Sequence, residues 1–167
     1  MKILGIDPGS HTTGYGIIRY QNNCVSHVEA GIISGHRKND VTSLTEIFSE
    51  IEKILEKHAP DAVAVEDIFF ASNAQSALKL GHARGVILLA VFRSGIPLFE
   101  YSALEVKKAV TGYGRADKTQ VQKMVAKLLD IKGKLPAHDA SDALAVAICH
   151  AHSTKKYTAS GKDLRGH

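Results

Sequence analysis

The stretch MKILGIDPGSHTTGYGIIRY, residues 1–20, indicates the fold because it contains two predicted strands joined by a turn. It also places a carboxylate, Asp7, at the end of the first strand. Residues 2–7 have the composition of a buried strand, and the Pro8-Gly9-Ser10 sequence after Asp7 is typical of a tight turn. Residues 13–20 are again rich in β-forming side chains, so the two strands are expected to pair as an antiparallel hairpin. Asp7 is then either an ordinary turn residue or part of a functional site.

The chain continues with a third strand and then alternates helices and strands. Beyond the third strand, apolar side chains recur at helical spacing, and two short apolar runs interrupt the helices. The expected helices cover 42–58, about 73–92, 103–110, 118–130 and 138–152, and the expected later strands cover 24–34, 62–65 and 96–101. This order predicts an α/β protein with a mixed five-stranded sheet and helices on both faces. It resembles the topology of ribonuclease H-like folds.

Charge is distributed unevenly along the chain. The net charge is +4, but residues 1–100 hold 9 Lys and Arg against 11 Asp and Glu, whereas residues 101–167 hold 12 against 6. A basic half favours a polyanionic partner, although a solvated helix face and a basic tail would give the same asymmetry. We predict a single domain over 1–152, followed by a basic, mobile tail over 153–167 that has almost no large apolar residues.

Composition also favours a cytoplasmic protein over a membrane protein. No apolar run reaches membrane-spanning length, and Met1-Lys2 leads directly into a strand rather than into a signal peptide. Cys24 and Cys149 lie in apolar contexts without CxxC pairing, so we expect both to be reduced core thiols.

Four carboxylates are not easily explained as helix surface. Asp7 and Glu66 each end an apolar strand, and Asp139 and Asp142 are three residues apart at the start of a predicted helix, so they share one face. Each of these residues has an ordinary alternative role as a turn former, a strand end or a helix cap. Together they favour a cluster that binds Mg²⁺, because hard divalent cations prefer oxygen ligands and relieve carboxylate repulsion. His138 is either a further metal ligand or an exposed residue at the start of the helix.

Three small residues recur every four positions in the predicted helix 73–92. These residues are Ala77, Gly81 and Gly85. Glycine inside a helix is costly without a packing reason, so this stripe favours tight internal packing over a dimer contact.

With these residues identified, the chain closely resembles the RuvC family of bacterial Holliday-junction resolvases. The resemblance lies in GIDPGSHTTGYGII (5–18), VEDIFFASNAQSALKLGHARGVIL (65–88), FEYSALEVKKAVTGYGRADKTQV (99–121) and HDASDALAVAICHAH (138–152). It implies a crossover junction endodeoxyribonuclease that depends on Mg²⁺, for which Mn²⁺ can substitute, with two ions in each active site. It also implies a homodimer that makes paired, symmetric nicks in a four-way DNA junction during homologous recombination and DNA repair, with the RuvA–RuvB branch-migration complex.

The family motifs assign roles to individual residues. The catalytic, metal-binding acids correspond to Asp7, Glu66, Asp139 and Asp142. Some members carry histidine at the third of these positions, so either Asp139 or His138 fills it here.

Residues that contact DNA are expected mainly in the basic stretch 101–134. Lys107 and Lys118 match basic DNA-contact positions of the family, and Arg115 lies between them. Lys123 and Lys127 are expected on the solvent face of a helix. Phe69 and Phe70 are expected to stack on unpaired bases, and core packing is the alternative role for both.

Three other functions share some of these features. The strand and glycine turn at the start also resemble the phosphate loop of actin-like ATPases and sugar kinases, but those enzymes need two such domains. An RNase H-like nuclease that acts on RNA shares the opening motif without the later ones. A junction-binding protein without cleavage activity is the third alternative, and the intact set of acids argues against it.

Overall fold

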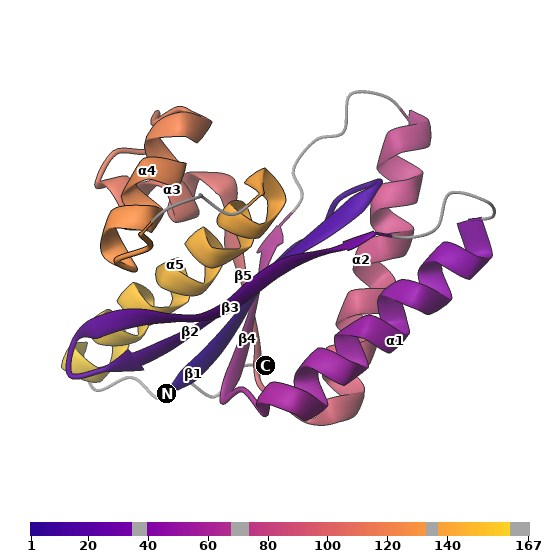
Figure 1. The fold of residues 1–167 in the computed structure, drawn as a ribbon, viewed down its shortest axis with the longest axis horizontal. Coiled ribbons are helices and arrows are strands. Elements are labelled where there is room, and N and C mark those ends of the chain that lie inside the picture. The colour runs from indigo at the N-terminus through magenta and orange to yellow at the C-terminus, as the bar shows by residue number, and fades with distance from the viewer. Residues whose placement is uncertain (35–39, 68–73, 133–136, 161–167) are drawn as a thin grey trace.

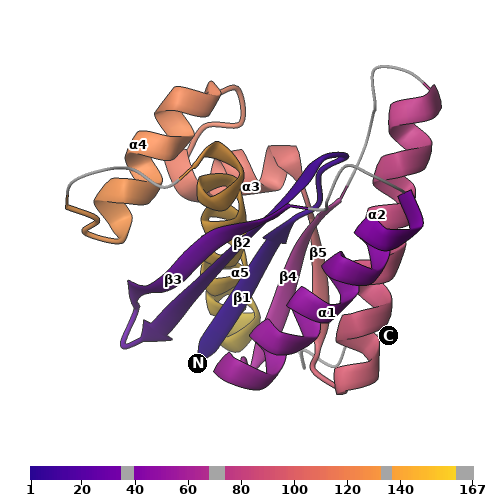
Figure 2. The same cartoon turned by 45° about the vertical axis from the view of Figure 1, so that its right-hand side comes forward.

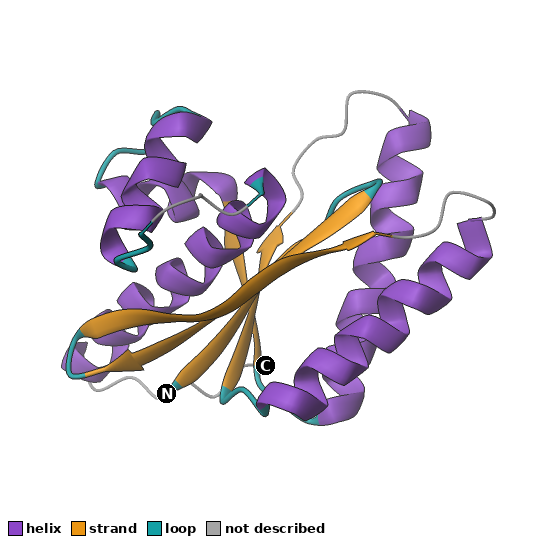
Figure 3. Cartoon of the chain, viewed as in Figure 1, coloured by secondary structure: helices purple, strands orange, loops and turns teal. Residues whose placement is uncertain are grey.

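The computed structural model describes residues 1–34, 40–67, 74–132 and 137–160. Its elements alternate in the predicted order, with a sheet between two groups of helices (Figures 1 and 3). The strands are β1 (Lys2–Asp7), β2 (Thr12–Gln21), β3 (Cys24–Ser34), β4 (Ala62–Asp67) and β5 (Leu98–Ser102). The helices are α1 (Asp40–His58), α2 (Ala74–Ser94), α3 (Ala103–Thr111), α4 (Lys118–Leu128) and α5 (His138–Ser160).

The five strands form one mixed sheet, as the sequence predicts, and their order is β3-β2-β1-β4-β5. β1 pairs antiparallel with β2 and parallel with β4, and β4 pairs parallel with β5. In the parallel pair, Ile6 lies opposite Val65, so the next residues, Asp7 and Glu66, lie side by side at the carboxyl ends of β1 and β4. This register is what brings two distant acids together.

Two hydrophobic cores lie on opposite faces of the sheet. α1 and α2 cover one face, and α5, α3 and α4 cover the other (Figure 2). Along β1, Leu4 and Ile6 pack toward α1 and α2, whereas Ile3 packs toward α5. Gly5 also faces α5, where an added Cβ would overlap the carbonyl oxygen of Ala143. α5 therefore lies directly on β1, which fixes its first turn next to Asp7.

The last helix extends further than its predicted end at residue 152. α5 continues through Ser160, so residues 153–160, which the sequence predicts as tail, are helical. Thr154 is buried and donates a hydrogen bond to the carbonyl oxygen of Ala151. The physical reason is the absence of any glycine or proline between 153 and 160; the first such residue is Gly161.

Two other expectations from the sequence are wrong. Gly81 and Gly85 do not pack internally, because a Cβ added at either glycine meets no atom within 4 Å. α2 instead contacts the core through its opposite side, which includes Ala83 and Ile87. Cys149 is buried as expected, but Cys24 at the start of β3 is exposed. Among the described helices, none has the length and apolar character needed to cross a membrane.

Candidate active site

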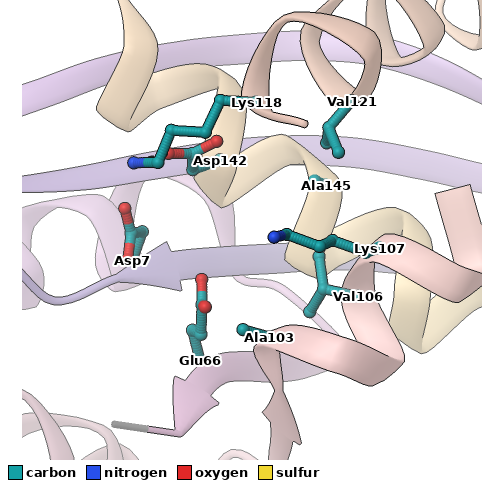
Figure 4. Close-up of a pocket in the computed structure, with 9 residues that line it drawn as sticks. All are labelled: Asp7, Glu66, Ala103, Val106, Lys107, Lys118, Val121, Asp142 and Ala145. Atoms are coloured by element: carbon teal, nitrogen blue, oxygen red, sulfur yellow. The ribbon is translucent and has the colours of Figure 1, made fainter. Parts of the chain in front are cut away.

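A pocket opens at the carboxyl ends of β1 and β4. α3, α4 and α5 supply its remaining walls (Figure 4). Three of the predicted acids and two of the predicted lysines face it, together with an apolar wall. The lining residues are Asp7, Glu66, Ala103, Val106, Lys107, Lys118, Val121, Asp142 and Ala145.

Asp7 is the most strongly perturbed acid in this pocket. Burial, followed by the charges of Glu66, Asp142 and Asp139, raises the pKa of Asp7 from 3.8 to about 8. Burial and the charge of Asp142 likewise raise the pKa of Glu66 above its ordinary value. The pKa shifts arise because carboxylates from three separate elements converge in a region poorly reached by water.

Lys118 and Lys107 bring positive charge to the same pocket. The Lys118 ammonium lies 3.5 Å from Oδ2 of Asp142, and the charge of Asp142 is the main cause that raises the pKa of Lys118. The charges of Lys118 and Lys107 both act to lower the pKa of Glu66. In Figure 4 both lysine side chains extend toward the space between the three carboxylates.

Local capping interactions fix the helices that carry these lysines. α4 begins at Lys118 because Asp117 caps it. The Asp117 side chain accepts a hydrogen bond from the backbone N–H of Gln120, and the Gln120 side chain accepts one from the backbone N–H of Asp117. Ser102 and Glu105 form the same reciprocal pair at the start of α3, which carries Lys107. Both lysines thus lie in the first two turns of well-defined helices.

Asp139 lies beside this pocket rather than in its wall. Its charge contributes to the raised pKa of Asp7, and its Oδ2 accepts a hydrogen bond from the hydroxyl of Thr12. Asp139 is therefore electrostatically coupled to Asp7. His138 is exposed at the start of α5. Thr12 is a contact that sequence reasoning missed, because a threonine at the start of a strand carries no distinguishing pattern.

Of the other predicted DNA-contact residues, Arg115 lies outside this pocket. Arg115 is exposed in the connection between α3 and α4. Lys123 and Lys127 are exposed opposite the buried side of α4, as expected from their spacing. Phe69 and Phe70 lie outside the described residues.

The donor set of the pocket fits a hard divalent cation. Its acids offer only carboxylate oxygens, the ligands that Mg²⁺ prefers, and their mutual repulsion would be relieved by a bound cation. In the conformation of the described residues, no three acidic, histidine or cysteine side chains are clustered closely enough to hold a metal ion.

Comparison with known proteins identifies the family. The family model described as "Crossover junction endodeoxyribonuclease RuvC" matches residues 3–150. A relative of that name from Citrifermentans bemidjiense is 53% identical over 154 residues, covering 92% of this chain and 93% of the relative. One from Burkholderia cenocepacia is 47% identical over 152 residues, covering 91% of this chain and 84% of the relative.

Solved structures agree with the sequence comparison. The structure described as "T. thermophilus RuvC in complex with Holliday junction substrate" superposes with a TM-score of 0.88 at 31% identity, covering 95% of this chain and 97% of that chain. The yeast mitochondrial Holliday junction resolvase Ydc2 shares the fold, with a TM-score of 0.69 at 14% identity, covering 94% of this chain and 80% of that chain. The chain belongs to the RuvC family of crossover junction endodeoxyribonucleases.

Proposed function

We propose that this chain is a divalent-metal-dependent endonuclease that resolves four-way DNA junctions by paired, symmetric nicks in homologous recombination and DNA repair. One observation carries the proposal: carboxylates from β1, β4 and α5 face a single pocket in a chain of the RuvC family. Junction DNA as the substrate is supported by the names of the relatives and by the related structure solved with a Holliday junction.

The acids of the pocket are the proposed metal ligands. Asp7, Glu66 and Asp142, with Asp139 beside them, would hold two Mg²⁺ ions, or Mn²⁺ in their place. When bound, such ions activate a water molecule and stabilise the leaving oxygen of a phosphodiester. The pKa of Asp7 is raised to about 8, so this side chain must release a proton when it binds metal near neutral pH.

The lysines of the pocket are the proposed contacts for the scissile strand. Lys107 and Lys118 lie next to the carboxylates, so they attract a DNA phosphate into an otherwise negative pocket. Arg115 extends this basic surface beyond the pocket. Phe69 and Phe70 follow Ile68 shortly after the end of β4 in sequence, which supports their proposed role in stacking on bases at the crossover.

A homodimer is supported by the outer face of α2. Leu78, Leu89 and Phe92 are 60%, 55% and 82% exposed and recur at helical spacing with Gly81 and Gly85. All five lie on the side opposite the buried residues of α2, and the two glycines leave room for close approach of another helix. We propose that two copies pair through this face, since two symmetric cuts need two active sites.

The cellular setting is proposed from the family. The proposed DNA-junction substrate supports a location in the cytoplasm. The family resemblance also supports cooperation with the RuvA–RuvB complex, which moves the junction along DNA.

Cleavage of defined substrates tests the proposed function. The protein is incubated with a synthetic four-way junction, a linear duplex of the same sequence and a structured RNA, each with Mg²⁺ and then with EDTA. We expect paired cuts near the crossover of the junction only, and none with EDTA. Junction binding without cleavage, or cleavage of RNA alone, would contradict the proposal.

A further inference from the structure

A hydroxyl outside the pocket contacts one of the proposed metal ligands. The Thr12 Oγ1 hydroxyl donates to Oδ2 of Asp139, joining the start of β2 to the first turn of α5. Both side chains are partly buried. The two residues are far apart in sequence, so only the fold creates this contact.

The backbones on both sides of this hydrogen bond are closely packed. A Cβ added at Gly14 would overlap the carbonyl oxygen of Asp139, so β2 touches the main chain of α5 directly. A Cβ added at Gly9 would overlap the carbonyl oxygen of Thr12, so the turn after Asp7 packs against the main chain of Thr12. Three parts of the chain therefore form one tightly packed unit: the turn after Asp7, the residue Thr12, and the first turn of α5.

Electrostatic repulsion explains why Asp139 needs such a partner. Asp139 lies close enough to Asp7 for its charge to raise the pKa of that group, and it shares a helix face with Asp142. Without a donor, repulsion from these carboxylates favours rotation of the Asp139 side chain toward solvent. The hydroxyl holds the side chain in place. Thr has few χ1 conformations because its Cβ is branched, so its hydroxyl is well oriented.

We propose that Thr12 is a positioning residue that holds the Asp139 carboxylate ready to bind metal. This inference rests on the proposed function, because it takes Asp139 as a metal ligand. Partners that orient a metal ligand typically contribute about 10–100-fold to metal affinity or activity, and Thr12→Val is expected to weaken Mn²⁺ binding by about this factor.

Mn²⁺ titration of the full chain, followed by calorimetry, measures this effect without relying on cleavage. Thr12→Val removes the hydroxyl at nearly constant shape, and Thr12→Ser restores it. Thr13→Val is the matched control: Thr13 is the next residue, is fully buried, and its hydroxyl has no hydrogen-bond partner in the described part of the chain. Thermal melting of each variant confirms that it is folded.

A double-mutant cycle separates positioning from a general structural effect. If Thr12 acts through Asp139, Thr12→Val weakens Mn²⁺ binding in the wild-type chain and has no further effect in Asp139→Asn. The Mn²⁺ affinities of Thr12→Ser and Thr13→Val are expected to stay within about threefold of the wild-type affinity. This change is far smaller than the loss expected for a mispositioned ligand. The inference would be overturned if Thr12→Val and Thr13→Val bound Mn²⁺ equally well, or if the wild-type chain did not bind Mn²⁺. It would also be overturned if Thr12→Val weakened Mn²⁺ binding as much in the Asp139→Asn chain as in the wild-type chain.

The same variants distinguish this inference from the proposed function. Thr12-dependent Mn²⁺ binding in a chain that does not cut junctions supports the positioning role and refutes the proposed activity. Normal junction cleavage with Mn²⁺ binding that is insensitive to Thr12 refutes only the positioning role.

Discussion

Replacing Asp7 by asparagine should change how the stability of the metal-free protein depends on pH. The pKa of Asp7 is about 8 in the folded chain, against 3.8 ordinarily. Between these values the folded state holds a proton that the unfolded state has released, so the free energy of unfolding falls as pH rises. At about 1.4 kcal/mol for each pKa unit, the loss between pH 4 and pH 8 is on the order of 5 kcal/mol.

Asparagine imitates the protonated form of Asp7 and does not titrate. We therefore expect wild type and Asp7→Asn to be about equally stable at pH 4 in EDTA. At pH 8 the free energy of unfolding of the variant should exceed that of wild type by several kcal/mol, because only the wild type loses stability as pH rises. Urea unfolding of both proteins at several pH values in EDTA measures this difference. A stability difference that stays constant from pH 4 to pH 8 would refute the account of the carboxylate cluster.

Three further predictions concern DNA binding, packing and assembly. Lys107→Ala should weaken junction binding and reduce the slope of log affinity against log salt by about 1. Lys123→Ala, on the solvent face of α4, should change both the affinity and the slope little. Equal effects of the two substitutions would show that Lys107 is not a specific DNA contact. Gly5→Ala should lower the free energy of unfolding by about 1–3 kcal/mol because its Cβ meets backbone atoms of α5. Urea unfolding in which Gly5→Ala is as stable as wild type would contradict the packing described. Leu89→Glu should shift the protein from dimer to monomer in analytical ultracentrifugation, and an unchanged dimer would place the interface elsewhere.

The sequence predicts the sheet and most of the pocket because both depend on local patterns. Asp7 and Glu66, at the carboxyl ends of apolar strands, lie side by side once the strands pair in parallel. The i, i+3 spacing of Asp139 and Asp142 predicts their shared helix face, and Lys118 joins the pocket as the family motif suggests.

Other features depend on contacts that no local pattern reveals. The hydrogen bond from Thr12 to Asp139 exists only because β2 and α5 touch. The glycines of α2 have the spacing of an internal contact, but which side of the helix faces the sheet is decided by larger residues such as Ile87. Cys24 is exposed because it begins β3, the strand at the edge of the sheet.

Single-turnover cleavage of a four-way junction by Glu66→Gln tests the central claim most directly. Glu66 lies in the pocket, whereas Glu56 is exposed on α1, on the other side of the sheet, so Glu56→Gln is the matched control. With Mg²⁺ we predict that Glu66→Gln binds the junction normally but does not cut it, and that Glu56→Gln cuts it at the wild-type rate. Cleavage by Glu66→Gln at the wild-type rate would contradict the claim that this pocket is the active site.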